Sequence, residues 1–276
     1  MSSILITGAT GFVGLPVAEQ LVAAGHKVTC VLRSGSENRL RGLNAELIFC
    51  SDLFEQTAEW WAQACCNIDM IIHLAWYAEP GKYITSDKNI DCLIGTMNLA
   101  RGAVAAGVMR FVGVGTCLEY DLNAGTLTVN TPLNPQTPYA AAKMAAYSML
   151  KAYLAEGVTT FLWARLFYLF GPREDARRLV PYLHAQLENG VKADLSSGTK
   201  IRDYMDVRDA AKLLLSDAFS SRQGATNICS GQATTIRALA ERIADRYSRR
   251  DLLNFNARPD NFKDPPKVLG SRDKFT

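Results

Sequence analysis

Short apolar runs alternate with longer segments through the first half of the chain. The apolar runs predict five strands, at residues 4–6, 26–32, 46–50, 69–75 and 109–115. The longer segments predict helices at residues 12–24, 89–106 and 139–155, of which the first two end at Gly25 and Gly107. This repeated alternation predicts an α/β fold with a doubly wound parallel sheet, whose ligands bind beyond the carboxyl ends of the strands.

A glycine-rich turn joins the first strand to the first helix. Gly8, Gly11 and Gly14 fall where a buried strand must turn tightly into a helix. Gly8 permits the turn, Gly11 lets a phosphate approach the backbone, and Gly14 lets the helix pack on the strand. The free amides of the helix N-terminus suit a pyrophosphate. The stretch therefore predicts a dinucleotide site, whose other contacts come from the intervening residues Thr10, Phe12 and Val13.

The end of the second predicted strand bears on the choice of dinucleotide. A carboxylate at this position would bind the two ribose hydroxyls of NAD. This chain instead has Arg33 and Ser34, which suit the 2′-phosphate of NADP, and Arg39 and Arg41 could assist. We therefore favour NADP (NADPH) over NAD; the alternative is that Arg33 is a solvated loop charge.

The next two strand ends complete the predicted cofactor site. Asp52, followed by Leu53, can accept a hydrogen bond from the adenine amino group or cap the helix that follows. Leu74 and Ala75 end the fourth strand beside the cofactor ribose, and we expect His73 to be structural. The loop at residues 76–87 could cover the substrate.

Composition and charge exclude several classes of function. The chain has 276 residues, 48% of them hydrophobic, so it can bury a large core. A net charge of +3 gives no support for a nucleic-acid surface. The sequence predicts neither a membrane helix nor, with a strand this close to Met1, a signal peptide. Seven cysteines without paired metal-ligand spacing indicate a reducing cytoplasm and no metal site.

Motifs spread along the chain carry a family resemblance. They are TGATGFVG at residues 7–14, Asp52-Leu53, HLA at 73–75, Thr116, YAAAK at 139–143, RLF at 165–167, Gly171-Pro172 and RDYMDVRD at 202–209. In this order they resemble the extended short-chain dehydrogenases/reductases of the NDP-sugar epimerase/dehydratase superfamily, and most of all the NDP-4-keto-6-deoxyhexose reductases. The resemblance implies a Rossmann-type NADP-binding domain at residues 1–165. A smaller C-terminal substrate domain at residues 166–276 would partly return to the sheet.

The resemblance gives catalytic roles to Thr116, Tyr139 and Lys143, and makes Tyr139 and Lys143 cofactor contacts as well. Tyr139 and Lys143 stand one helical turn apart. A free tyrosine has a pKa of about 10, and a charged lysine beside the cofactor ribose would lower that pKa. The Thr116 hydroxyl can bind the reacting carbonyl oxygen and order the proton transfer.

The residues after Thr116 indicate which reaction is possible. Related dehydratases carry an acidic pair where this chain has Cys117 and Leu118. Related epimerases that deprotonate beside a ketone have a cysteine at the position of Leu118, and we expect Cys117 to point away, as strand neighbours do. Glu119 should be structural or solvent-facing. Hydride transfer alone remains, as a net 4-ketoreductase drawing on NADPH or as a 4-epimerase. The rival classes are a reductase of a non-sugar carbonyl and an NADP-binding scaffold.

Arginines in the second half could bind the diphosphate of a nucleotide-diphosphate sugar. By resemblance, Arg202 contacts this diphosphate and Arg258 lies in a late diphosphate-binding segment. Arg177 and Arg178 precede a helix whose start could receive phosphate, or they lie on a solvated helix face. Each guanidinium can bind two oxygens at once, so several together suit a pyrophosphate.

The other elements of the second half are expected as follows: strands at 165–170 and 201–204, helices at 179–189 and 210–219, and Asp206 and Asp209 capping the last helix. By resemblance, the helices at 89–106 and 139–155 could pair across a homodimer. Family members usually continue past Gly270 with a helical tail, so the end at Thr276 is expected to be short or truncated.

Overall fold

Seven parallel strands form the main sheet of the computed structural model, which describes residues 1–262 and 264–272. Their spatial order is β12-β7-β5-β4-β1-β2-β3. Their bounds are β1 Ser3–Thr7, β2 Lys27–Arg33, β3 Glu46–Cys50, β4 Met70–His73, β5 Arg110–Thr116, β7 Thr160–Leu166 and β12 Gly224–Ile228. The chain runs outward from β1 to β3 and then crosses back to β4, so the predicted doubly wound sheet is confirmed. The direction reverses between β1 and β4, where such sheets bind ligands.

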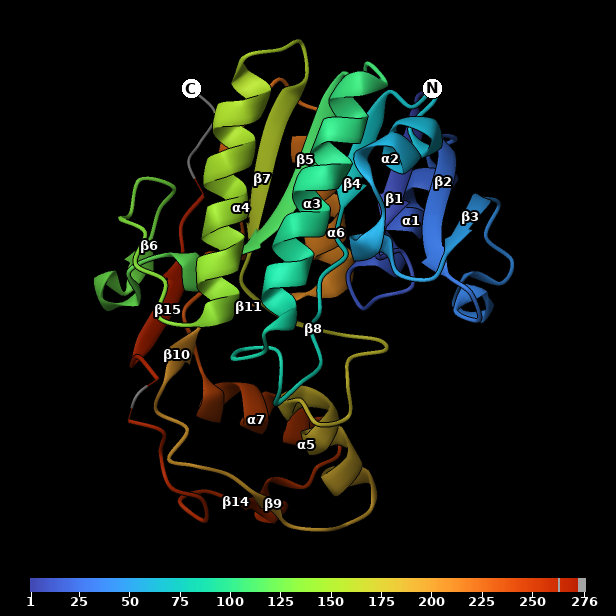
Figure 1. Cartoon of the computed structure of the whole chain (residues 1–276). Coiled ribbons are helices and arrows are strands. Elements are labelled where there is room, and N and C mark those ends of the chain that lie inside the picture. The colour runs from blue at the N-terminus through green and yellow to red at the C-terminus, as the bar shows by residue number, and fades with distance from the viewer. Residues whose placement is uncertain (263, 273–276) are drawn as a thin grey trace.

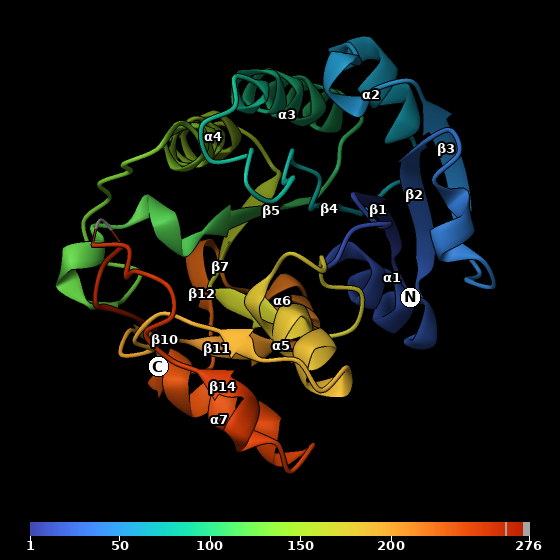
Figure 2. The same cartoon turned by 90° about the horizontal axis from the view of Figure 1, so that it is seen from below.

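Helices cover both faces of this sheet (Figure 2). One face carries α1 (Gly14–Ala23) and α6 (Val207–Ala218), and the other carries α2 (Ala58–Ala64), α3 (Lys88–Ala105) and α4 (Pro138–Ala155). Strand β1 shows the alternation that separates the two cores. Its Ile4 and Ile6 pack toward α1 and α6, whereas Leu5 packs toward α2, α3 and α4. No helix among residues 1–262 and 264–272 is long and apolar enough to cross a membrane.

A smaller part lies below the sheet in Figure 1 and contains α5 (Leu179–Glu188) and α7 (Ile236–Asp245). These helices share a separate apolar core that includes Leu183, Leu187, Leu239 and Ile243. Three small sheets accompany them: β8 (Tyr168–Phe170) with β11 (Tyr204–Asp206), β9 (Ala193–Asp194) with β14 (Leu253–Asn254), and β13 (Thr234–Thr235), β10 (Ile201–Arg202), β15 (Lys267–Gly270) and β6 (Thr126–Leu127). The division of the chain at residue 165 into cofactor and substrate domains stays a prediction.

Two predicted strands are divided in the structure. The strand expected at residues 165–170 is the end of β7, which begins at Thr160, followed by the separate β8, which pairs with β11 instead of the main sheet. The strand expected at 201–204 is interrupted at Asp203. This buried carboxylate accepts hydrogen bonds from the backbone amides of Ser230, Gly231 and Gly270, so it ties separate segments together where the strand breaks.

Other predicted bounds differ less. The last sheet helix begins at Val207, because Asp206 caps it by accepting from the amide of Arg208 at 2.8 Å. Strand β12, which was not predicted, completes the sheet beside β7. The expectation of a short or truncated end concerns residues 273–276, which lie outside the described residues.

Candidate functional site

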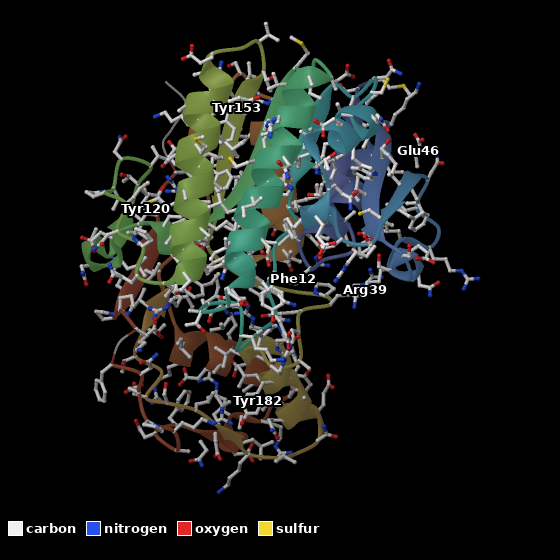
Figure 3. The ribbon with its side chains drawn as sticks, in the orientation of Figure 1. Phe12, Arg39, Glu46, Tyr120, Tyr153 and Tyr182 are labelled. Atoms are coloured by element: carbon white, nitrogen blue, oxygen red, sulfur yellow. The ribbon has the colours of Figure 1, made fainter. Side chains whose placement is uncertain are left out.

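A cleft of about 1660 Å³ opens where the carboxyl ends of the central strands meet the smaller part of the molecule. Figure 3 shows Phe12 and Arg39 between the sheet and this smaller part, while Tyr182 lies within the smaller part. The cleft is lined from both sides, by the glycine turn and strand ends above and by residues of the segment 166–180 with Tyr204 and Asp264 below. Its position is that of a ligand site in a doubly wound sheet.

The glycine turn forms the cleft wall beside β1. Gly8 has a φ of +76°, and a Cβ there would lie 2.7 Å from the amide nitrogen of Ala75. A Cβ on Gly14 would lie 2.0 Å from the carbonyl oxygen of Gly8, so the helix can approach the turn only with glycine here. Gly11 faces the cleft, and no side chain caps the N-terminus of α1. This cradle fits a dinucleotide pyrophosphate, and the remaining predicted turn residues, Thr10, Phe12 and Val13, line the cleft with it.

The wall beyond β2 is cationic. Arg33, at the end of β2, and Arg39 both line the cleft, and Arg39 donates to the carbonyl oxygen of Thr10 at 3.3 Å. Among the described residues, Ser36 lines this wall instead of the predicted Ser34. The reason is the tight turn after β2, in which the Ser36 hydroxyl donates to the carbonyl of Arg33 at 2.6 Å. No carboxylate ends β2.

The other predicted cofactor residues lie along the same cleft. Asp52 and Leu53 line it, and the Asp52 carboxylate accepts from the amide of Phe54 at 2.8 Å, so the capping alternative occurs. Leu74 and Ala75 line it at the end of β4. His73 is buried between the hydroxyls of Thr7 (2.7 Å) and Thr96 (2.9 Å), and burial lowers its pKa to about 3. It is therefore a structural histidine, as expected.

Thr116, Tyr139 and Lys143 line one stretch of the cleft. Thr116 ends β5, and Tyr139 lies in the first turn of α4, two residues after the N-cap Thr137. Burial holds the pKa of Tyr139 well above its ordinary value, and the nearby Thr116 side chain acts on that pKa in the opposite direction. The phenol is therefore protonated at neutral pH.

Lys143 lies one turn further along α4 and is buried. Its Nζ donates to the carbonyl oxygen of Val114 at 2.6 Å and stands 3.8 Å from the ring centre of Trp76. Burial lowers the pKa of Lys143 to about 7, although the charge of Glu119 opposes this shift. No sequence pattern indicates the Trp76 contact, because Trp76 is only the first residue of the loop expected at 76–87.

Glu119 forms buried hydrogen bonds beside Thr116 and Lys143. Its carboxylate is fully buried and accepts from the Thr116 amide (2.8 Å), the Trp163 indole (3.1 Å) and Arg165 Nε (2.7 Å). With Thr116 as N-cap it forms a capping box on the 3₁₀ turn Cys117–Glu119. Of the two expected roles, structural and solvent-facing, the structure shows the structural one.

The strand ends at Thr116 and a 3₁₀ turn follows, so strand alternation does not apply to Cys117. Cys117 and Leu118 both contribute to the lining of the cleft. The Cys117 side chain is nevertheless buried in an apolar cluster that includes Tyr120 and Phe167. Burial raises the pKa of the Cys117 thiol to about 12. This thiol is therefore protonated at neutral pH and unsuited to act as a base.

The four predicted diphosphate arginines occupy different environments. Among the described residues, Arg178 is the only one of the four that lines the cleft. Arg202 is buried and donates to Asp264, a lining residue, at 2.6 Å. Arg177 is exposed and pairs with Asp175 at 2.8 Å. Arg258 donates to the Tyr182 hydroxyl at 3.3 Å, within the smaller part of the molecule.

The cleft also contains polar residues that the sequence did not single out for it. Arg173 faces both the glycine turn and Arg39, with a left-handed φ of +67°. Glu174 has a buried carboxylate oxygen without a hydrogen-bond partner in the described structure, and burial raises its pKa to about 7. The break at Gly171-Pro172 was the only sequence signal for this turn.

The model of the NAD dependent epimerase/dehydratase family matches residues 4–228, which contain the glycine cradle and the Thr116, Tyr139 and Lys143 group. The chain belongs to this family. It is an NAD(P)-dependent enzyme of the extended short-chain dehydrogenase/reductase type, as the motifs predicted.

Individual relatives in the epimerase/dehydratase family differ in activity. A dTDP-6-deoxy-L-talose 4-dehydrogenase (NAD(+)) from Aggregatibacter actinomycetemcomitans is 26% identical, over 98% of this chain and 100% of its own. A UDP-glucose 4-epimerase from Mycolicibacterium smegmatis is 28% identical, over 91% of this chain and 85% of its own. Among solved structures, UDP-N-acetylglucosamine 4-epimerase from Methanobrevibacter ruminantium M1 has a TM-score of 0.88 at 23% identity, covering 98% of this chain and 89% of that one.

Proposed function

We propose that this enzyme reduces the C4 ketone of a nucleotide-diphosphate 4-keto-6-deoxy sugar with NADPH. The observation that carries the proposal is the grouping of Thr116, Tyr139 and Lys143 at the wall of a cleft that also contains a dinucleotide cradle. The bound nicotinamide supplies the hydride. Tyr139 donates its phenolic proton to the ketone oxygen, Thr116 holds that oxygen, and the Lys143 cation stabilises the tyrosinate that forms.

Reduction fits the protonation of the site. Because burial raises the pKa of Tyr139, the phenol holds its proton at neutral pH and can donate it. No acidic residue follows Thr116 directly, and the Cys117 thiol is protonated. Glu119 is buried in hydrogen bonds to Thr116, Trp163 and Arg165. None of the three residues after Thr116 supplies a base for elimination or for deprotonation beside the ketone.

The names of the relatives describe two kinds of reaction at C4 of the sugar, oxidation and epimerisation. The name of the Aggregatibacter relative describes oxidation at C4 of a dTDP-6-deoxy sugar, the reverse of the reduction proposed here. The names of other relatives describe 4-epimerases, which also act at C4. The second candidate function is therefore a 4-epimerase, in which the same Tyr139 would first accept and then return a proton.

We also propose that NADPH is preferred over NADH. Arg33 and Arg39 line the cleft wall beyond β2, and β2 ends in Arg33 where a carboxylate would bind an unmodified ribose. Guanidinium groups suit a 2′-phosphate because each can donate two hydrogen bonds to it. The Aggregatibacter relative is named for NAD(+), so the two proteins would differ on this point.

The substrate diphosphate is assigned to the lower wall of the cleft. Arg178 lines it directly, and Arg202 lies behind the lining residue Asp264, to which it is bonded. These cations, at the opposite wall from the glycine cradle, support a second diphosphate site and hence a nucleotide sugar over a simple carbonyl compound. Arg177 and Arg258 would have to leave their present partners to take part.

The homodimer expected by resemblance is also a proposal. Ile90 and Ile94 on α3 and Met149 and Tyr153 on α4 are exposed, one turn apart on each helix. Figure 3 shows Tyr153 on the outer helix layer. Two copies could bury these side chains against each other. Light scattering should show a dimer, and Ile94→Arg should shift it to a monomer.

A substrate screen tests the proposed reaction. Candidate nucleotide-diphosphate 4-keto-6-deoxy sugars are incubated with NADPH, and both cofactor absorbance and product mass are followed. The proposal requires loss of NADPH in equal amount to a product that has gained one hydrogen molecule. Conversion of a non-keto nucleotide sugar without net loss of NADPH would instead establish the 4-epimerase.

A further inference from the structure

Lys143 is a buried cation whose surroundings contain aromatic rings. Its Nζ lies 3.8 Å from the ring centre of Trp76 and 5.8 Å from that of Trp163. The carbonyl oxygen of Val114 accepts its hydrogen bond at 2.6 Å. Within residues 1–262 and 264–272, no carboxylate forms an ion pair with it. A buried ammonium without a carboxylate partner needs another source of stabilisation, and the face of an indole ring is one.

The Trp76 ring is itself held in place. Its Nε1 donates to the side-chain oxygen of Asn89 at 2.8 Å, and its edge meets the ring of Phe54. Asn89 is buried on the first turn of α3 and donates to the carbonyls of Tyr83 (2.7 Å) and Ser86 (2.8 Å). The indole is therefore fixed by a helix and by the loop at 76–87, independently of Lys143.

We propose that Trp76 is a positioning residue that keeps Lys143 charged and in place beside Tyr139. The inference rests on the proposed function, in which the Lys143 cation stabilises the tyrosinate. An uncharged π face suits this task better than a carboxylate would. A carboxylate next to Lys143 would also repel the negative charge that forms on Tyr139, whereas the ring of Trp76 stabilises the cation without adding a negative charge.

The other titratable groups around Lys143 do not replace this role. Burial lowers the pKa of His73 on β4 to about 3 and raises that of Cys92 on α3 to about 11, so both are neutral near pH 7. Tyr139 on α4 is protonated there. The buried carboxylate of Glu119 favours the charged lysine, but it is bonded to Arg165 at 2.7 Å.

Removing the Trp76 ring should lower the pKa of Lys143, because the cation–π contact favours the charged form. Burial already lowers the pKa of Lys143 to about 7, so loss of a cation–π contact should lower it further. A desolvated contact of this kind corresponds to a shift of about one pH unit. The proposed reaction needs the charged lysine. The pH above which activity falls should therefore be lower in the variant, by about the same amount as the pKa of Lys143.

The test is an NMR titration of the protein without substrate. The ¹³Cε resonance of Lys143, assigned by its loss in Lys143→Arg, is followed with pH in the parent, in Trp76→Leu and in Trp76→Phe. We expect a downward shift of about one unit in Trp76→Leu and a smaller one in Trp76→Phe, which keeps an aromatic face. Trp60→Leu is the matched control, because it removes a tryptophan from the same core cluster without touching Lys143.

The outcomes separate this inference from the proposed function. An unchanged titration in Trp76→Leu, an upward shift from water entering the site, or an equal shift in Trp60→Leu would each overturn the role of Trp76. If Trp76→Leu does not fold, Trp76→Phe alone decides by the same criterion. The NMR result holds whether or not any sugar is reduced, whereas the substrate screen tests the reaction whatever the titration shows.

Discussion

Replacing Glu119 should have the largest single effect on stability among the residues around the site. Its carboxylate and Arg165 form a fully buried pair at 2.7 Å, and it also accepts from the Thr116 amide and the Trp163 indole. Glu119→Ala leaves the Arg165 charge buried without its partner. Breaking such a pair costs about 3–5 kcal/mol. This is a large share of the roughly 5–15 kcal/mol that stabilises a typical domain.

The assay is urea unfolding followed by circular dichroism, with the midpoint and slope compared between variants. Replacing both charges together, as Glu119→Leu with Arg165→Leu, should recover much of the loss, because apolar groups of similar size can replace a buried pair. Asp251→Ala is the control, since it breaks an exposed arginine–carboxylate pair and should change the midpoint little. A Glu119→Ala midpoint no lower than that of the control would refute the reasoning.

Three further predictions concern binding. Arg33→Ala should weaken NADPH binding far more than NADH binding, and equal losses in a fluorescence titration would contradict the NADP assignment. Arg178→Ala and Arg202→Ala should each raise the KM for the nucleotide sugar and leave NADPH affinity nearly unchanged. Arg177→Ala, which changes an exposed residue, should leave this KM unchanged. Unaltered KM values in both Arg178→Ala and Arg202→Ala would contradict the proposed diphosphate site. Lys143→Ala should lower activity and NADPH affinity together, and a loss of activity alone would separate the lysine from the cofactor.

Local sequence signals predicted the parts of the fold that depend on local chemistry. The turn at Gly8 needs a residue with positive φ and without a Cβ, and glycine in the sequence signals both requirements. The strands that follow are short apolar runs, and β3 has the predicted bounds. Elements that depend on long-range pairing were less accurate. Strand β8 pairs with β11 instead of continuing β7, and this depends on a partner 36 residues away that no local pattern reveals.

The candidate site shows the same limit. The spacing of Tyr139 and Lys143 on one helix follows from helical geometry, so it was readable in the sequence. The contact between Lys143 and Trp76 joins a helix to a distant loop, and no local pattern in the sequence indicates it. Likewise, Arg258 lies in a segment that resembles a diphosphate-binding motif, but it donates to Tyr182 and does not line the cleft. Motifs identified the family, whereas tertiary packing determined which side chains meet.

The most direct test of the proposed reduction follows the hydride itself. NADPH carrying deuterium at the transferable C4 position of its nicotinamide is supplied with a nucleotide-diphosphate 4-keto-6-deoxyhexose in ordinary water. We expect the deuterium at C4 of the product sugar, one for each NADPH consumed, and a kcat lower by about 10²–10⁴-fold in Tyr139→Phe. In the converse experiment, with unlabelled NADPH in deuterated water, enzyme-dependent deuterium at C3 or C5 of the sugar would contradict the account, and so would a Tyr139→Phe variant that turns over at the parent rate.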